Sequence, residues 1–250
     1  MLVKRISLVV FVLCLTITFF NSDYAYSEIS NDTSSVKTLN KASRTISFRD
    51  LYQRIYSGKA TLEQVKLALT TKDSTKLVNT MHALYAMRWH AGVHNLLYKM
   101  WEIDKDEAPK ISWDLIEKPP VRIALASTIN RIDILKSKDI REYIRSFKYD
   151  DDVLNRGQAL VALGLNGDPV DVPYLEEMAD SNNRYLTQIG VSSLAFMENS
   201  TAKESLISLA KKHYDTPRGK LILDVLSRSY NVVPVSKEEY EKANAEENIN

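Results

Sequence analysis

One stretch near the middle of the chain constrains its fold more than any other. Residues 156–178 read RGQALVALGLNGDPVDVPYLEEM, which predicts a helix, a sharp corner and a second helix. Gly167 can adopt the positive φ of a helix C-terminus, Asp168 can cap the next helix, and Pro169 suits its first turn. After this corner, apolar residues recur three apart, as on the inner stripe of an amphipathic helix.

Looser copies of this helix pair occur before and after it. In the best copy, Leu163 anchors the first helix, and Gly164 follows it where the next layer must approach closely. Equivalent apolar anchors recur at intervals of 31 to 45 residues, at Leu84, Ile129, Leu194 and Val225. Internal repetition of this kind is typical of folds in which each helical pair packs on the next. The widest interval is filled by residues 104–120, which we interpret as an insertion.

These helical pairs resemble the HEAT-like repeat family. The resemblance rests on residues 159–169 of the best copy, ALVALGLNGDP, and on Val121-Arg122, which opens the copy before it. It covers roughly residues 76–229. It implies an all-α fold, an α-solenoid of roughly four to five HEAT-like helical pairs. An irregular helical bundle without the curvature of a solenoid is the alternative.

The beginning of the chain has the composition of a secretory signal. Residues 1–27 contain the basic residues Lys4 and Arg5, followed by an apolar run. The segment Ala25-Tyr26-Ser27 then offers small residues before an expected cleavage site. The apolar run is short for a membrane span, so we expect cleavage before Glu28 rather than an uncleaved anchor. The mature protein would then be periplasmic or secreted, without membrane insertion. The short signal and small size indicate a bacterial source.

The rest of the chain is expected to form one domain between two polar segments. Residues 28–45 are rich in Ser, Thr and Asn and predict a flexible leader, and residues 232–250 predict a polar C-terminal tail. The HEAT-like domain would therefore span residues 46–231. No linker divides the repeats, which is why we expect a single domain.

An additional helical pair is expected before the first repeat. Residues 48–56 and 61–69 carry helical apolar spacing, and Gly58 separates them. Thr61 and Gln64 have the spacing of a capping box, which marks the start of the second helix. This pair would cover the open apolar edge of the first repeat.

Composition narrows the class of partner. The chain has 33 Lys and Arg against 32 Asp and Glu, a formal net charge of +1, and removal of the signal lowers it to zero. Nucleic-acid binding usually requires a basic surplus, so we expect no nucleic-acid partner. The only cysteine, Cys14, lies in the signal segment, which excludes disulfides and cysteine metal sites from the mature chain.

The sequence predicts no catalytic residue, metal or cofactor. His90 and His94 lie four apart and could share a metal on one continuous helix, but they are expected at the corner between two helices. The paired His-Glu motifs of HEAT-like iron hydroxylases are absent. Asp150-Asp151-Asp152 lacks the spacing of a calcium loop and is expected ahead of a helix N-terminus. Some HEAT-like proteins are lyases that attach bilin pigments, which keeps an enzyme as an alternative.

Aromatic residues gather in the first repeat and in the insertion. They are Tyr85, Trp89, Tyr98, Trp101 and Trp113. Trp and Tyr are over-represented at binding hot spots, which is one interpretation of the cluster. The helical spacing of Leu97, Met100 and Trp101 favours the other, in which these residues fill the less regular end of the molecule.

The second helix of each pair is expected to line a concave surface that binds a partner, with the first helices on the convex side. The outward positions of the second helices are Arg141, Glu142, Arg145, Tyr174, Glu177, Lys203 and Ser208. Their mixed charge fits a folded protein or peptide better than a uniformly charged polymer. We therefore expect an adaptor or scaffold that binds another envelope or exported protein. A HEAT-like lyase, a metal-dependent protein using His90 and His94, and a purely structural subunit are the alternatives.

Overall fold

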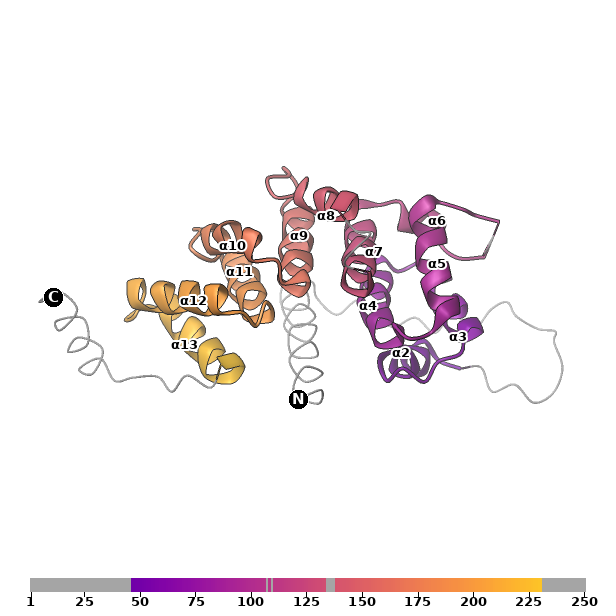
Figure 1. The fold of residues 1–250 in the computed structure, drawn as a ribbon, viewed down its shortest axis with the longest axis horizontal. Coiled ribbons are helices and arrows are strands. Elements are labelled where there is room, and N and C mark those ends of the chain that lie inside the picture. Colours follow the sequence, from indigo (N-terminus) through magenta and orange to yellow (C-terminus); the bar gives the residue numbers. More distant parts are fainter. Residues whose placement is uncertain (1–45, 107, 109, 134–137, 231–250) are drawn as a thin grey trace, which may run out of the picture.

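The computed structural model describes residues 46–106, 108, 110–133 and 138–230. Within these ranges the chain forms twelve α-helices, two short 3-10 helices and no strand, so the described fold is all-α, as the sequence predicts. The molecule is elongated, with α2 to α7 towards one end, α8 and α9 in the middle and α10 to α13 towards the other end (Figure 1). The expected signal, leader and C-terminal tail lie outside the described residues.

The additional helical pair at the start of the domain is confirmed. Helix α2 (Phe48–Tyr56) ends just before Gly58, whose φ is 69°, and α3 (Leu62–Ala68) follows. The hydroxyl of Thr61 accepts a hydrogen bond from the backbone N–H of Gln64, and the Gln64 side chain accepts one from the Thr61 N–H. This capping box pairs two donors that the helix itself leaves unpaired.

The remaining helices fall into two sets. The first helices, which carry or adjoin the apolar anchors, are α4 (Ser74–Ala83), α7 (Pro119–Ile132), α9 (Val153–Asn166), α11 (Arg184–Phe196) and α13 (Pro217–Tyr230). The second helices are α5 (Ala91–Glu102), α8 (Lys138–Arg145), α10 (Val172–Ala179) and α12 (Ser200–Lys212). The short elements are η1 (Leu84–Met87), α6 (Trp113–Ile116) and η2 (Pro169–Asp171). Of these, α6 lies within the predicted insertion.

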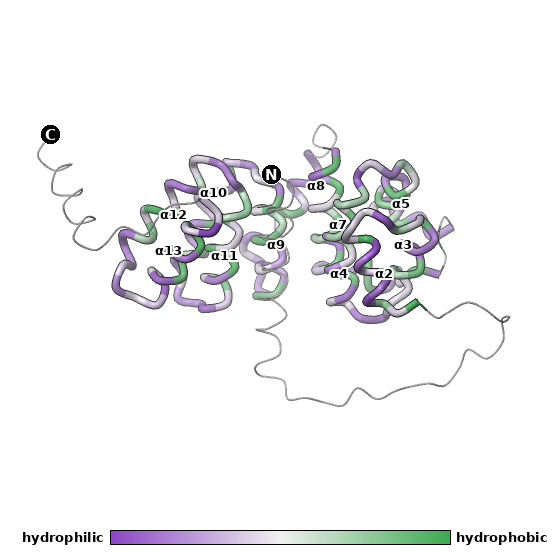
Figure 2. Tube along the Cα trace, turned by 90° about the horizontal axis from the view of Figure 1, so that it is seen from below, coloured by the Kyte–Doolittle hydropathy of each residue, from purple (hydrophilic) through white to green (hydrophobic). Residues whose placement is uncertain are grey.

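The predicted anchors lie in the hydrophobic core. Leu84, Leu163 and Leu194 are 0% exposed and Ile129 is 1% exposed, whereas Val225 is half-buried. Hydrophobic and hydrophilic residues alternate along the helices (Figure 2), as expected for helices with one buried face. Among the described helices, none is both long and apolar enough to cross a bilayer.

The first helices pack against one another in chain order and form the more buried set. Helix α7 contacts α4 and α9, and α11 contacts α9 and α13. In α7, every side chain from Ile123 to Asn130 is buried. This burial shows that α7 contributes little to the surface of the molecule. A helix that is buried on all sides is part of the interior.

Glycines allow the closest helix contacts. A Cβ atom on Gly164 would lie 2.6 Å from the carbonyl oxygen of Ser193 in α11, and one on Gly190 would lie 2.6 Å from the backbone nitrogen of Ala179 in α10. Both distances are too short for a carbon contact, so the two helix contacts require glycine. The close approach predicted at Gly164 is confirmed.

The corner after α9 also has the predicted geometry. Gly167 adopts a φ of 71° at the helix C-terminus, and Pro169 begins η2. The side chain of Asp168 accepts a hydrogen bond from the backbone N–H of Val170 at 3.2 Å. These local features fix the angle at which the chain leaves α9.

Buried polar side chains connect α7 with the helices on either side of it. The hydroxyl of Thr128 donates to the carbonyl oxygen of Met81 in α4 at 2.8 Å. The hydroxyl of Ser127 lies 3.2 Å from the side-chain amide of Asn166 in α9. Because a buried polar group must find its partner, these contacts favour one packing register of α4, α7 and α9.

Candidate partner-binding surface

Three of the predicted binding residues are exposed, one on each of three successive second helices. Glu142 lies on α8, Glu177 on α10 and Ser208 on α12, and Lys203 on α12 is half-buried. Tyr149, which is 67% exposed, adds an aromatic side chain, and its hydroxyl donates to the Glu177 carboxylate at 3.1 Å. We call Glu142, Tyr149, Glu177 and Ser208 the second-helix row.

The two predicted arginines take part in an internal ion-pair cluster. Arg145 donates to Asp171 at 2.9 Å and to Asp168 at 2.8 Å, and Arg141 lies 3.3 Å from Asp168. Asp171 is only 1% exposed, and the Nζ of Lys148 lies 2.8 Å from its other oxygen. The hydrogen bond to Asp171 is the main reason that the pKa of Arg145 is raised. Arg141 and Arg145 thus hold α8 against the segment that leads into α10, a structural role that the sequence did not predict for either residue.

Tyr174 lies in the interior rather than on the partner-facing side of α10. Its side chain is 5% exposed, and its hydroxyl donates to the carbonyl oxygen of Lys148. Burial raises the pKa of this phenol. The assignment from the sequence is wrong because α10 is short and is buried over a wider arc than the stripe of Val172, Leu175 and Met178.

A second ion-pair cluster joins the end of α10 to α12 and α13. The carboxylate of Asp180 accepts hydrogen bonds from Lys212, from His213 at 2.6 Å and from Arg218 at 2.9 Å. Burial alone would raise the pKa of Asp180, but the hydrogen bonds from Lys212 and His213 lower it below its usual value. Sequence reasoning missed both clusters because their members are far apart along the chain, and no local pattern connects them.

The histidine pair lies at the corner between η1 and α5, as expected. His90 is exposed and precedes the first residue of α5, and the Nε2 of His94 is hydrogen-bonded to the carbonyl oxygen of Arg88. Across the part of the chain that the structure describes, no group of three His, Cys, Asp or Glu side chains could hold a metal ion. The contact to Arg88 gives His94 a role within this corner.

The three consecutive aspartates precede α9, as predicted. The side chain of Asp152 accepts a hydrogen bond from the backbone N–H of Leu154 at 2.8 Å and caps the helix. Asp150 in turn accepts one from the backbone N–H of Asp152 at 2.9 Å. These contacts explain the three aspartates as residues that cap the N-terminus of α9 and the turn before it.

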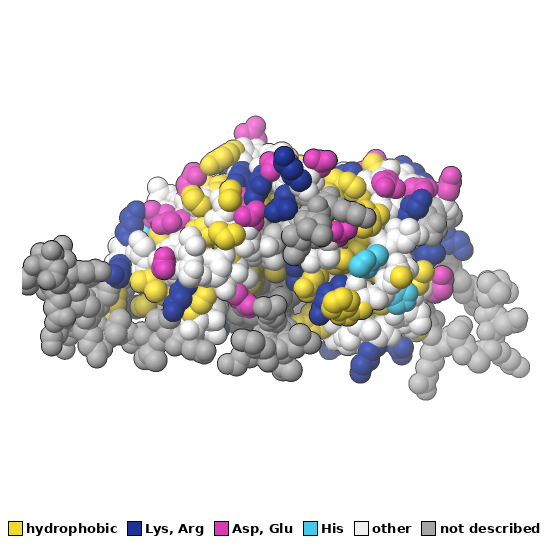
Figure 3. All heavy atoms as spheres, viewed as in Figure 1, with side chains coloured by type: hydrophobic (Ala, Val, Ile, Leu, Met, Phe, Trp, Pro, Cys, Tyr) yellow, Lys and Arg dark blue, Asp and Glu magenta, His cyan; other side chains and the backbone are white. Residues whose placement is uncertain are grey.

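Trp89 is the most exposed large hydrophobic residue of the described chain, at 86%. The guanidinium of Arg88 lies 5.3 Å from the centre of its ring and 4.8 Å from that of Tyr85. Arg131, near the end of α7, lies 3.8 Å from the centre of the Tyr85 ring. We call Tyr85, Arg88, Trp89 and Arg131 the Trp89 corner. Figure 3 shows histidines beside a hydrophobic patch flanked by Lys or Arg at this end of the molecule.

The other two tryptophans have packing roles. Trp113 is 7% exposed, and its indole N–H donates to the carbonyl oxygen of Ala108 at 3.2 Å. Trp101 is half-buried, lies edge-on to Tyr143 with ring centres 5.2 Å apart, and stacks with Arg122 at 4.3 Å. The packing interpretation of the aromatic cluster is therefore correct for Trp101 and Trp113, whereas Trp89 remains available to a partner.

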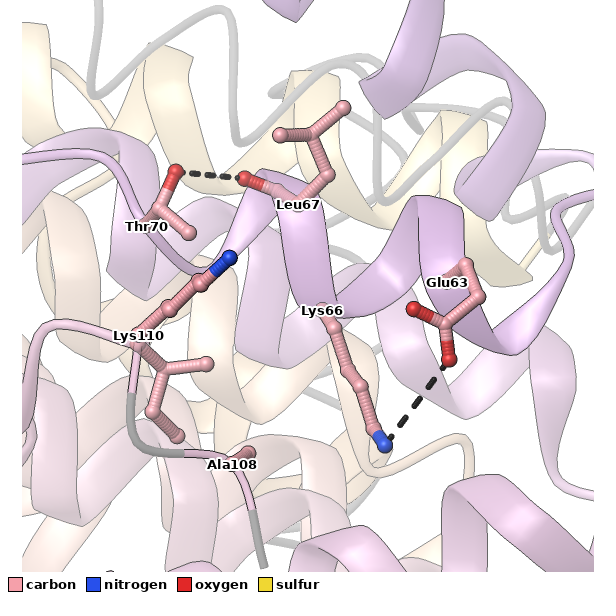
Figure 4. Close-up of a pocket in the computed structure, with 7 residues that line it drawn as sticks. Glu63, Lys66, Leu67, Thr70, Ala108 and Lys110 are labelled. Atoms are coloured by element: carbon pink, nitrogen blue, oxygen red, sulfur yellow. Dashed lines mark hydrogen bonds and ion pairs between the residues drawn. The ribbon is translucent and has the colours of Figure 1, made fainter.

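A shallow hollow of about 330 Å³ lies beside α3 (Figure 4). It is lined by Glu63, Lys66, Leu67, Thr70, Ala108, Lys110 and Ile111. Lys66 pairs with Glu63 at 3.9 Å, and the Thr70 hydroxyl donates to the carbonyl oxygen of Leu67 at 2.8 Å. Because these polar groups already contact one another, we assign no site to the hollow.

Comparisons with known proteins add no function to these observations. No family model matches the chain, and no curated protein or solved structure matches it either. The second-helix row and the Trp89 corner are the surface features of the described chain that suit a partner.

Proposed function

We propose that this protein is a HEAT-like α-solenoid of roughly four to five helical pairs that acts as a protein-binding adaptor or scaffold in the cell envelope. The chain-order packing of the first helices supports the solenoid. The Asp171 cluster, which joins α8 to α10, and the Asp180 cluster, which joins α10 to α12, support it further. In a solenoid each pair packs mainly on its neighbours, which leaves an extended surface for a partner.

The second-helix row is the observation that carries the proposal. It places exposed side chains on α8, α10 and α12, and it combines two carboxylates, a hydroxyl and the exposed ring of a tyrosine paired with Glu177. A surface that mixes charged, polar and aromatic groups suits another protein better than a uniformly charged polymer. Three of its four residues lie on helices, and the Tyr149 hydroxyl is held by its hydrogen bond to Glu177.

A location outside the cytoplasm is part of the proposal. Residues 1–27 have the composition of a secretory signal, which makes a periplasmic or secreted protein our proposal. The partner would then be another envelope or exported protein.

Site-specific photo-crosslinking in living cells tests this function. A photoreactive residue replaces Glu142, Glu177 or Ser208 in the full chain, and the same residue at the exposed Lys220 on α13 is the control. We expect one and the same protein to be crosslinked from the three row positions and not from Lys220. Equal or absent crosslinking at all four positions would contradict an adaptor that uses the second-helix row.

A further inference from the structure

We propose that the Trp89 corner is an anchor point for an acidic segment of the partner protein. In this arrangement a carboxylate of the segment binds the guanidinium of Arg88, and an adjacent apolar side chain packs on the Trp89 ring. The inference rests on the proposed function, since it names the chemistry of a partner that the adaptor would hold. It adds a site on η1, the turn that follows it and the end of α7, separate from the second-helix row.

The residue types of the corner are those that dominate binding energy at protein interfaces. Trp, Tyr and Arg are the three types most enriched among hot spots, and the corner consists of these types alone. The indole of Trp89 is 86% exposed, although the other tryptophans of the chain are packed. A partner that covers this ring would remove a large apolar area from water.

The charge of the corner indicates an acidic partner. Arg88 forms no ion pair with a carboxylate of the described residues; its side-chain contacts are the Tyr85 carbonyl oxygen at 3.3 Å and the rings of Tyr85 and Trp89. A planar guanidinium matches a carboxylate with two parallel hydrogen bonds.

The corner is held in place before any partner arrives. The backbone N–H of Arg88 donates to Tyr85 at 3.2 Å, and that of His90 donates to Met87 at 2.9 Å, which fixes the peptide units on both sides of Trp89. The imidazole of His94 bonds the carbonyl oxygen of Arg88. A preordered site loses little conformational freedom on binding, which favours its use as an anchor.

Trp89 also supplies the readout that tests the inference. The full chain is titrated with short acetylated peptides in which glutamates flank one Leu, Phe or Tyr, and the tryptophan emission is recorded. Since Trp101 is half-buried and Trp113 is buried, the largest change should come from Trp89 and should be absent in Trp89→Phe. We expect a blue shift with the acidic peptides and none with the same peptides carrying glutamine.

A pair of arginine variants separates the site from general charge effects. Arg88→Gln should weaken binding about tenfold or more, as expected for a hot-spot arginine. The matched variant Arg49→Gln changes an exposed arginine on α2 and should bind as the wild type does. The inference is overturned if Arg88→Gln binds the acidic peptides as tightly as the wild type does. It is also overturned if the wild type binds the glutamine peptides as tightly as the glutamate peptides.

Two other outcomes also contradict the acidic anchor. An unchanged emission with every peptide would show that the corner does not bind an acidic segment. A shift with a neutral oligosaccharide in place of the peptides would make Trp89 a platform for a sugar ring. In either case the adaptor function is tested independently by the photo-crosslinking experiment at the second-helix row.

Discussion

His82 is the buried side chain whose protonation depends most on the fold. It lies in α4 at 8% exposure, and neither ring nitrogen has a hydrogen-bond partner among the described residues. Burial, together with the positive charge of Arg131, lowers the pKa of His82 from 6.5 to about 3. His82 therefore binds a proton more tightly in the unfolded chain than in the folded chain. The contribution of neutral His82 to the free energy of unfolding is therefore fully present above pH 6.5 and is lost as the pH falls toward 3.

We predict that His82→Phe flattens the pH dependence of stability between pH 7 and pH 5. The wild type should lose up to about 1.4 kcal/mol of unfolding free energy per pH unit below pH 6.5, because the unfolded state takes up one more proton. Urea denaturation at several pH values measures this slope, and His90→Phe, which changes an exposed histidine, is the control. Parallel curves for the wild type and His82→Phe would show that His82 is not the group responsible.

The lowered pKa of Asp180 acts in a different pH range. Its folded-state pKa lies below the value of about 3.9 for an unfolded aspartate, so its contribution is present above that pH and is lost as the pH falls further. Between pH 6.5 and about pH 5 the effect of His82 can therefore be measured with little contribution from Asp180.

Helix contacts determine how far the fold could be predicted from the sequence. The capping box at Thr61, the positive φ at Gly167 and the start of η2 at Pro169 were predictable because each depends on neighbouring residues alone. The outward side of each helix was less predictable. Tyr174 is buried and Arg145 is held by Asp171 because of contacts with other helices, which periodicity along one helix does not contain.

The contact between α9 and α11 gives the first prediction at the scale of helices. Gly164→Ala should lower the unfolding free energy by about 1–3 kcal/mol, since the added methyl would meet the Ser193 backbone. Alanine normally stabilises a helix relative to glycine by about 1 kcal/mol, so the sign of the change is diagnostic. Ser208→Ala on the exposed side of α12 is the control and should not destabilise. A more stable Gly164→Ala variant would mean that the two helices do not approach this closely.

The junction of α8 with α10 gives the second prediction at the scale of helices. Asp171→Ala removes the buried carboxylate that faces Arg145 and Lys148, and should cost about 3 kcal/mol. Lys148 would lose the carboxylate it pairs with while partly buried, and Arg145 would keep only Asp168 and Glu142. Glu142→Ala removes an exposed carboxylate from the same arginine and should cost less than about 1 kcal/mol. Chemical denaturation compares the two variants, and equal costs would place the strength of the junction elsewhere.

On the scale of the whole molecule, the buried contacts form one hydrophobic core that extends through all the described helical pairs. Leu163 lies near the middle of this core and is 0% exposed. Leu163→Asp should abolish the cooperative thermal transition, because it places an unpaired charge between helix layers. Circular dichroism during heating measures this effect. An unchanged transition would show that the repeat alignment anchored on Leu163 is wrong.

Binding of another exported protein through the second-helix row is the central claim, and affinity capture from an envelope extract tests it most directly. Three full-length baits are compared: the wild type, the double variant Glu142→Lys with Glu177→Lys, and Lys220→Glu as a matched charge reversal away from the row. We predict one protein that the wild type and Lys220→Glu retain and that the double variant loses. Retention of that protein by all three baits, or specific retention of none, would contradict the claim.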